Sequence, residues 1–198
     1  MREIGRLREM TFALAGGGTG EPVDIDEQDT ADICYEQLIV YSPEDEEITG
    51  RYRYIDCGKA GSDDKHELST SHYFHFSALF KREYLPTCIE LGRSWVNPKY
   101  QPLNNPRKGL FALDNLWDGL GAIVLLHPKM EYFFGKVTMY TKYNDDAKRA
   151  VLGFLKAYFP DADDLVTPIH PLYTSVNNHE INKLVKGLEF KEGLKVLQ

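Results

Sequence analysis

Helical and β-prone segments interleave along this chain, and their order constrains the fold more than any other feature. From Arg2 to Ala15 apolar side chains recur at helical spacing, and the glycine run that begins at Gly16 ends the helix. The runs 36–41 and 47–55 are rich in β-forming residues and flank a polar turn, which predicts a hairpin. The remaining expected elements are strands at 87–96 and 131–140 and helices at 108–126 and 145–159. A surface loop is expected over 57–71 and a short helix over 74–83. The helix over 108–126 is expected to bury an apolar stripe at Leu110, Leu113, Trp117, Leu120 and Val124. This order predicts one mixed α/β domain.

Composition and charge exclude several classes of function. The 198 residues contain 23 basic and 30 acidic side chains, a net charge of −7, so no nucleic-acid partner is expected. The longest apolar run, Gly119 to Leu126, is far shorter than the roughly 20 residues of a membrane span. Three cysteines without a Cys-x-x-Cys pair disfavour a disulfide framework and a zinc ribbon. These features predict a cytoplasmic protein without a transmembrane segment.

The sequence lacks the standard motifs of serine hydrolases, zinc proteases, phosphate loops and dinucleotide-binding folds. The run Gly16–Gly20 follows a helix and precedes acidic residues, which is the wrong context for phosphate binding. His72 and His75 match no zinc spacing, so no metal site is expected. The acids around Asp24 and Asp26 leave three interpretations open: a cation site, a solvated loop, or a surface that attracts a cationic amine.

Two charged residues, Glu90 and Arg93, interrupt a run that otherwise favours a β-strand. Charges within a sheet require partners, so the two residues form satisfied ion pairs or the floor of a functional cleft. On a regular strand they face opposite sides, and Arg53 from a neighbouring strand is then the expected partner of Glu90. A β-bulge near Gly92 would instead bring Glu90 and Arg93 to one side.

Four stretches in this order resemble one enzyme family: Arg6–Phe12 (RLREMTF), Asp24–Asp29 (DIDEQD), Gly50–Arg53 (GRYR) and Glu90–Ser94 (ELGRS). The family comprises amino-acid N-acyltransferases that use acyl-carrier-protein thioesters, make ornithine or glycine lipids and are often labelled hemolysins. They are relatives of the acyl-homoserine-lactone synthases within the wider GNAT superfamily. The resemblance implies an α/β fold with a central mixed, mostly antiparallel sheet flanked by helices. It implies a GNAT-like domain over residues 1–171 and a helical tail over 172–198 that begins a further, incomplete C-terminal portion.

The resemblance also implies roles for individual residues. An amine that attacks a thioester needs a base and donors for the developing oxyanion. Glu90 is the expected base, and Arg53 and Arg93 orient it or stabilise charge. The expected substrate-binding residues are Arg8, Phe12, Asp24, Asp26, Asp29 and Trp117. Phe12 and Trp117, together with Leu7 and Leu116, are expected either to line an acyl pocket between two helices or to belong to the ordinary core. The residues expected to bind the donor phosphopantetheine are Val96, Arg107, Lys108 and Gly109.

One departure from the sequence pattern of the wider superfamily narrows the choice of acyl donor. Its usual acetyl-coenzyme-A loop is absent, because Gln101 is followed by Pro-Leu-Asn. Acyl carrier protein is therefore the expected donor and partner, acyl-coenzyme A is less favoured, and no permanently bound cofactor is expected. Because carrier proteins are acidic, a local basic face is expected from Arg107, Lys108, Lys142, Lys148 and Arg149.

The expected function is transfer of a long acyl chain to the amino group of an amino acid such as ornithine or glycine. Two alternatives stay open: an acetyl-coenzyme-A-dependent N-acetyltransferase, and a non-catalytic acyl-binding module of the same fold. Peripheral membrane contact through a lipid product also stays open.

Overall fold

The computed structural model describes residues 1–32, 34–60, 68–101, 103–171 and 183–196. The chain divides into two compact units, the first formed by Met1–His72 and Lys81–Val137 and the second by Tyr73–Phe80 and Thr138–Gln198. The domain boundary expected at residues 171 and 172 borders 172–182, which lie outside the described residues, and it stays a prediction.

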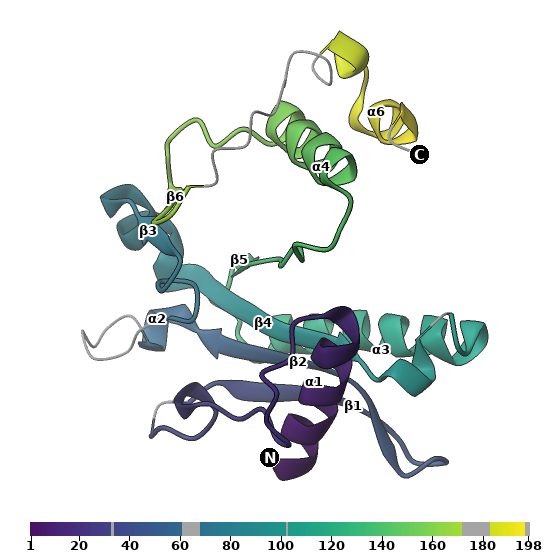
Figure 1. Ribbon diagram of the computed structural model, residues 1–198. Coiled ribbons are helices and arrows are strands. Elements are labelled where there is room, and N and C mark those ends of the chain that lie inside the picture. Colours follow the sequence, from purple (N-terminus) through teal and green to yellow (C-terminus); the bar gives the residue numbers. More distant parts are fainter. Residues whose placement is uncertain (33, 61–67, 102, 172–182, 197–198) are drawn as a thin grey trace. The chain divides into compact units, whose positions relative to one another are not determined.

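A four-stranded sheet in the order β1-β2-β4-β5 forms the centre of the first unit (Figure 1). The strands β1 (Glu36–Ser42), β2 (Glu47–Asp56) and β4 (Cys88–Val96) are antiparallel neighbours, and β5 (Tyr132–Gly135) pairs with β4 in parallel. The expected hairpin and the mixed α/β class are therefore confirmed. The strand expected over 131–140 is shorter, because β5 ends at Gly135.

One face of this sheet packs against α3 (Pro106–Leu126), whose Leu120 and Ile123 form a hydrophobic cluster with Tyr54 and Ile89. The expected apolar stripe of this helix was displaced from the face that is actually buried, and Trp117 is 73% exposed. Small residues allow the close packing, since a Cβ on Gly119 would lie 2.8 Å from the side chain of Leu38.

By length and composition alone, α3 is apolar enough to cross a membrane. Of its apolar window 28% is buried, and Leu120 and Ile123 of the buried part belong to the core of the first unit.

Helix α1 (Arg2–Ala15) directs its buried side chains toward the other face of the sheet. It has the bounds expected from the sequence. It ends at Gly16, whose φ of 93° is the left-handed conformation that glycine adopts without strain. The glycine-rich run that follows is held by Glu9, whose carboxylate accepts hydrogen bonds from the backbone of Thr19 and Gly20 at 2.7 and 2.8 Å. These two backbone N–H groups of the glycine-rich run are thus hydrogen-bonded to a carboxylate of the protein itself.

The segment between β2 and β4 differs most from expectation. The surface loop expected over 57–71 begins with the short helix α2 (Cys57–Ala60), and Ser69 and Thr70 are buried. Residues 61–67 of that loop lie outside the described residues. The short helix expected over 74–83 is replaced by the strand β3 (Phe74–Phe76) and a π-helical turn at Phe80–Tyr84.

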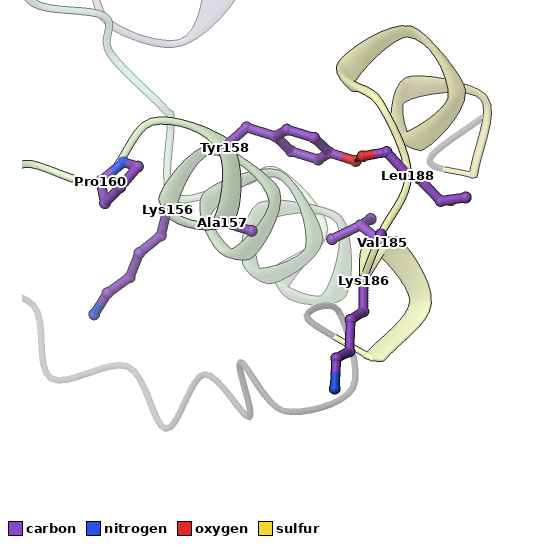
Figure 2. Close-up of a pocket in the computed structure, with 8 residues that line it drawn as sticks. Lys156, Ala157, Tyr158, Pro160, Val185, Lys186 and Leu188 are labelled. Atoms are coloured by element: carbon purple, nitrogen blue, oxygen red, sulfur yellow. Dashed lines mark hydrogen bonds between the residues drawn. The ribbon is translucent and has the colours of Figure 1, made fainter.

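In the second unit β3 pairs with β6 (Val166–Pro168), and α4 (Asp145–Tyr158) confirms the helix expected over 145–159. Asn144 caps α4 by accepting hydrogen bonds from its first turn. The expected tail helix is represented by α6 (Phe190–Val196), whose Phe190 ring lies tilted to that of Phe154 and edge-to-face with that of Tyr158. A pocket of about 510 Å³ lies between the end of α4 and residues 185–188, and the Tyr158 hydroxyl donates to the carbonyl of Leu188 beside it (Figure 2). The predicted site residues do not line this pocket.

Candidate active site

The acidic segment after α1 is folded against that helix. Asp26 caps a 3₁₀ turn at Glu27–Asp29, and Asp29 returns a hydrogen bond by accepting from the Asp26 backbone. Arg8, fully buried on α1, forms ion pairs of 2.9 Å with Asp24 and with Asp29. Because Asp24 and Asp29 are also buried, the interpretation of this segment as a solvated loop is wrong for those two residues.

Two arginines of β2 reach the same acids from the sheet. Arg51 and Arg53 are two positions apart and therefore share a face of the strand. Arg53 Nη1 lies 2.7 Å from an Asp26 carboxylate oxygen and 3.3 Å from one of Asp29. Arg51 donates from Nε to the Gln37 amide oxygen at 2.6 Å and lies 3.4 Å from Asp29. The alternation of Arg51 with Arg53 was a signal in the sequence that could have identified Arg51.

A β-bulge turns Arg93 toward this set of charges. Between the pairs Arg51–Trp95 and Arg53–Gly92, β4 contains one more residue than β2, and Arg93 has a positive φ of 45°. Its guanidinium lies 2.7 Å from Asp24 and 2.9 Å from Asp26. The regular-strand expectation for Arg93 is therefore wrong, and the bulge alternative describes the structure.

Glu90 is fully buried, but its partners are not arginines. Tyr35 donates its hydroxyl proton to one carboxylate oxygen at 2.6 Å, and Ser69 Oγ and the Thr70 backbone donate to the other at 3.0 and 3.1 Å. The expected Glu90–Arg53 pair is wrong because Asp26 and Asp29 occupy the Arg53 guanidinium. Arg53 instead lies over the Tyr35 ring, 4.6 Å from its centre.

The charged residues described above shift one another's pKa values and those of their neighbours. We call them the charge cluster: Arg8, Asp24, Asp26, Asp29, Arg51, Arg53 and Arg93. Burial raises the pKa of Asp29, but the Arg8 hydrogen bond and charge outweigh it and hold that pKa below its usual range. Burial and the nearby Arg8 charge lower the pKa of Arg51 to about 10. Beside the cluster, burial and the Glu90 carboxylate raise the pKa of Tyr35.

One further cation near Glu90 gave no signal in the sequence. Lys136, the first residue after β5, donates from Nζ to the carbonyl oxygen of Ser69 at 3.1 Å. Its side chain reaches solvent, while partial burial of the ammonium lowers its pKa. Tyr35, Ser69 and Thr70 were missed for the same reason as Lys136, because they meet Glu90 only through the tertiary fold.

The structure does not bring Phe12 and Trp117 together. Phe12 is half-buried on α1, whose Arg8 reaches the charge cluster on one face of the sheet. Trp117 is on α3, which packs on the opposite face with Tyr54 and Ile89. The acyl pocket expected between these two helices is therefore wrong, because the sheet separates them.

The residues expected to bind the donor lie at the end of β4 and the start of α3. Val96 is the last residue of β4, and Gly109 is buried in α3. Arg107 and Lys108 line a pocket of about 540 Å³, where Lys108 Nζ lies 2.7 Å from Asp45 and lowers the pKa of that carboxyl to about 2.

The expected basic face is divided between the two units. Arg107 and Lys108 belong to the first unit, whereas Lys142, Lys148 and Arg149 belong to the second. In the second unit Lys148 and Arg149 form ion pairs with acids of their own helix, Asp145 and Asp146.

Metal-ligating side chains are scattered. Within the described residues no group of three or more His, Cys, Asp or Glu could hold a metal ion. His72 belongs to the first unit and His75 to β3 of the second. The three cysteines are free thiols, with Cys57 and Cys88 buried.

The family model of the acetyltransferase (GNAT) domain matches residues 7–107, which include the whole charge cluster. The complete chain is 52% identical to a glycine N(alpha)-acyltransferase from Bacteroides thetaiotaomicron and 48% identical to one from Phocaeicola vulgatus. It spans about three fifths of the length of these relatives, 59% and 61%. No solved structure matches the chain.

Proposed function

Because the chain belongs to the GNAT acyltransferase family, we propose that it transfers an acyl group from a thioester to the amino group of glycine. The observation that carries this proposal is the match of the whole chain, at 52% identity, to a relative named for that activity. Glycine is the acceptor named for both relatives, and ornithine is the second acceptor to be tested.

In the proposed reaction the neutral amine forms a bond to the thioester carbonyl carbon, and the carbon–sulfur bond then breaks. The amine loses one proton and the departing thiolate gains one. Glu90 is the proposed acceptor of the amine proton, and its complete burial favours a path through a water molecule or the Ser69 hydroxyl over direct contact. Arg53 and Arg93 fix the acidic segment beside it through Asp26. Arg8, Asp24 and Asp29 are proposed to hold that wall of the amine site.

Backbone groups of β4 are the proposed donors for the oxyanion and the pantetheine arm. The pairing of β4 with β5 stops at Leu91, whereas β4 continues to Val96. Arg107 and Lys108, in the pocket at the start of α3, are proposed to meet the donor phosphate. The exposed ion pair between Lys108 and Asp45 is weak enough to be exchanged for such a partner.

We further propose that the acyl donor is a long-chain thioester of acyl carrier protein and that the reaction takes place in the cytoplasm. The absence of the usual acetyl-coenzyme-A loop in the sequence supports this choice, and free buried thiols suit a reducing compartment. An acetyltransferase remains the rival, because the matching family model describes acetyltransferases.

The test incubates the purified chain with glycine or ornithine and with palmitoyl carrier protein, palmitoyl-coenzyme A or acetyl-coenzyme A, and identifies products by mass spectrometry. N-palmitoylglycine formed fastest from the carrier protein supports the proposal. Acetylglycine alone would favour the rival enzyme. Donor binding without any product would favour a non-catalytic module.

A further inference from the structure

Several buried N–H groups on the α1 side of the sheet lack a hydrogen-bond acceptor. Among the described residues, Arg8 Nη1, Arg51 Nη1 and the indole Nε1 of Trp95 are buried without a partner. All three side chains are fully or almost fully buried, so bulk water does not reach these donors. Native proteins rarely leave a buried N–H without an acceptor, because its desolvation is then uncompensated. The three donors therefore indicate an acceptor that the described residues do not supply.

The three side chains belong to one layer of the first unit. Arg51 and Trp95 are directly paired between β2 and β4, so their side chains project from the same face of the sheet. Arg8 comes from α1 and meets Arg51 at a shared carboxylate, because Asp29 lies 2.9 Å from Arg8 Nη2 and 3.4 Å from Arg51 Nη2. In both guanidiniums Nε and Nη2 contact oxygens of the protein, which leaves Nη1 as the unused group.

Negative charge is also scarce around Arg51. Its one ion pair within the described part of the chain is with Asp29, and that carboxylate is shared with Arg8 and Arg53. Burial and the neighbouring guanidinium charges lower the pKa of Arg51 to about 10, and Asp29 opposes them only in part. The layer thus has a surplus of hydrogen-bond donors and a surplus of positive charge at the same place.

The remaining buried carboxylates of the described chain are engaged elsewhere. Glu9 accepts hydrogen bonds from the backbone of the glycine-rich run. Glu90 accepts from a tyrosine hydroxyl, a serine hydroxyl and a backbone N–H. Both oxygens of Asp24 contact other nitrogens, those of Arg8 and Arg93. The acceptor for the three unused donors is therefore expected to come from solution.

We propose that Arg8, Arg51 and Trp95 bind one small monovalent anion, a halide or the carboxylate group of a small acid, between α1 and the sheet. An anion accepts hydrogen bonds without donating any, which matches a set that consists of donors alone. A water molecule would bring two O–H donors of its own into a layer where acceptors are already scarce. Hydrogen bonds from a guanidinium to an anion are strong, and the low dielectric of the interior strengthens them further. Binding of this anion does not depend on the proposed acyl transfer.

The experiment uses Trp95 as a built-in probe of the site. The chain has two tryptophans, and Trp117 is 73% exposed, so Trp117→Phe leaves Trp95 as the single fluorophore. Bromide quenches indole fluorescence on contact, and it is titrated against gluconate at constant ionic strength. Because Trp95 is buried, quenching should saturate as the site fills, with none of the linear dependence of random collisions.

Two arginine variants in this single-tryptophan background test the assignment. Arg51→Gln should raise the bromide concentration that gives half-maximal quenching by about tenfold or more, because it removes a charged donor. Arg6→Gln is the matched control: it removes an exposed arginine of α1 and should leave that concentration unchanged. Quenching that is linear in bromide, or that is equal in the two variants, would overturn the inference and leave water as the partner of these donors.

Acetate distinguishes the two sources of the anion. If acetate displaces bromide and restores the fluorescence, the site accepts carboxylates, and if acetate has no effect, the site is a halide site; either result supports the proposal. A measurement on the wild-type chain decides the matter if Arg51→Gln does not fold. Its unfolding midpoint in urea should rise with the logarithm of the chloride concentration at constant ionic strength, because a ligand that binds the folded state alone stabilises it. A midpoint that does not change when chloride replaces gluconate would overturn the inference.

Discussion

Removing the Tyr35 hydroxyl tests whether the buried Glu90 carboxylate depends on the hydrogen-bond donors around it. Tyr35 donates to Glu90 and its oxygen accepts the backbone N–H of Ser69 at 2.8 Å. Tyr35→Phe keeps the ring beneath Arg53 but leaves a buried carboxylate oxygen and a buried N–H without these partners. At about 1–3 kcal/mol for each such group, the free energy of unfolding should fall by about 2–6 kcal/mol.

Urea unfolding followed by circular dichroism measures this loss, and Tyr54→Phe provides a matched control. Tyr54 is also buried and also donates to a carboxylate, that of Glu36 at 3.0 Å, but Glu36 is exposed and water can replace the lost donor. The control should lose about 1 kcal/mol or less. If the two variants lose the same small amount, the argument that Glu90 depends on buried donors is refuted.

The remaining predictions concern catalysis, acid stability and strand spacing. Glu90→Gln should fold, bind the donor and lose about 10²–10⁴-fold in turnover, measured as N-acylglycine formed per minute; near-normal turnover would leave Glu90 with a structural role. The pKa of Asp29 is held below its unfolded value of about 3.9, so its contribution to stability is complete above that pH and is lost as the pH falls. Asp29→Asn should therefore show a shallower fall in the unfolding midpoint below about pH 4 than the wild type, and parallel curves would contradict this. Gly135→Ala should lower the free energy of unfolding by about 1–3 kcal/mol, because the added Cβ would meet a β4 carbonyl. Gly121→Ala, exposed on α3 with open space around it, should raise the free energy of unfolding by about 0.5–1 kcal/mol. Equal effects of the two substitutions would refute the steric argument.

The elements that could be predicted from the sequence are those whose signals are local. Helix α1 has the predicted bounds because its periodicity and the Gly16 terminus lie within a few residues. The hairpin was predictable because its polar turn lies between two β-forming runs. For α3 the sequence predicted the helix but misplaced its buried face, since small residues such as Gly119 allow close packing without contributing to an apolar stripe.

The candidate site shows the opposite case. Arg8, Arg53 and Arg93 could be proposed because they lie in recognisable stretches, but their partners could not be assigned. Glu90 is satisfied by Tyr35, 55 positions away, and by Ser69 and Thr70, which lie in a segment whose polar composition is typical of a surface loop. The bulge at Arg93 depends on how β4 is matched against β2, which the sequence of one strand does not determine.

The charge cluster also governs how the first unit comes apart. Its members come from α1, the acidic segment, β2 and β4, and the contact between Arg93 and Asp24 spans 69 positions. Detaching any one of these elements would leave buried ions without their counterions, at a cost of several kcal/mol for each. Helix α1 is thereby held against fraying by the ion pairs of Arg8, in addition to its buried Ile4 and Leu7. The cluster thus couples four segments into a single cooperative folding unit, and opening of the candidate site by local unfolding is suppressed.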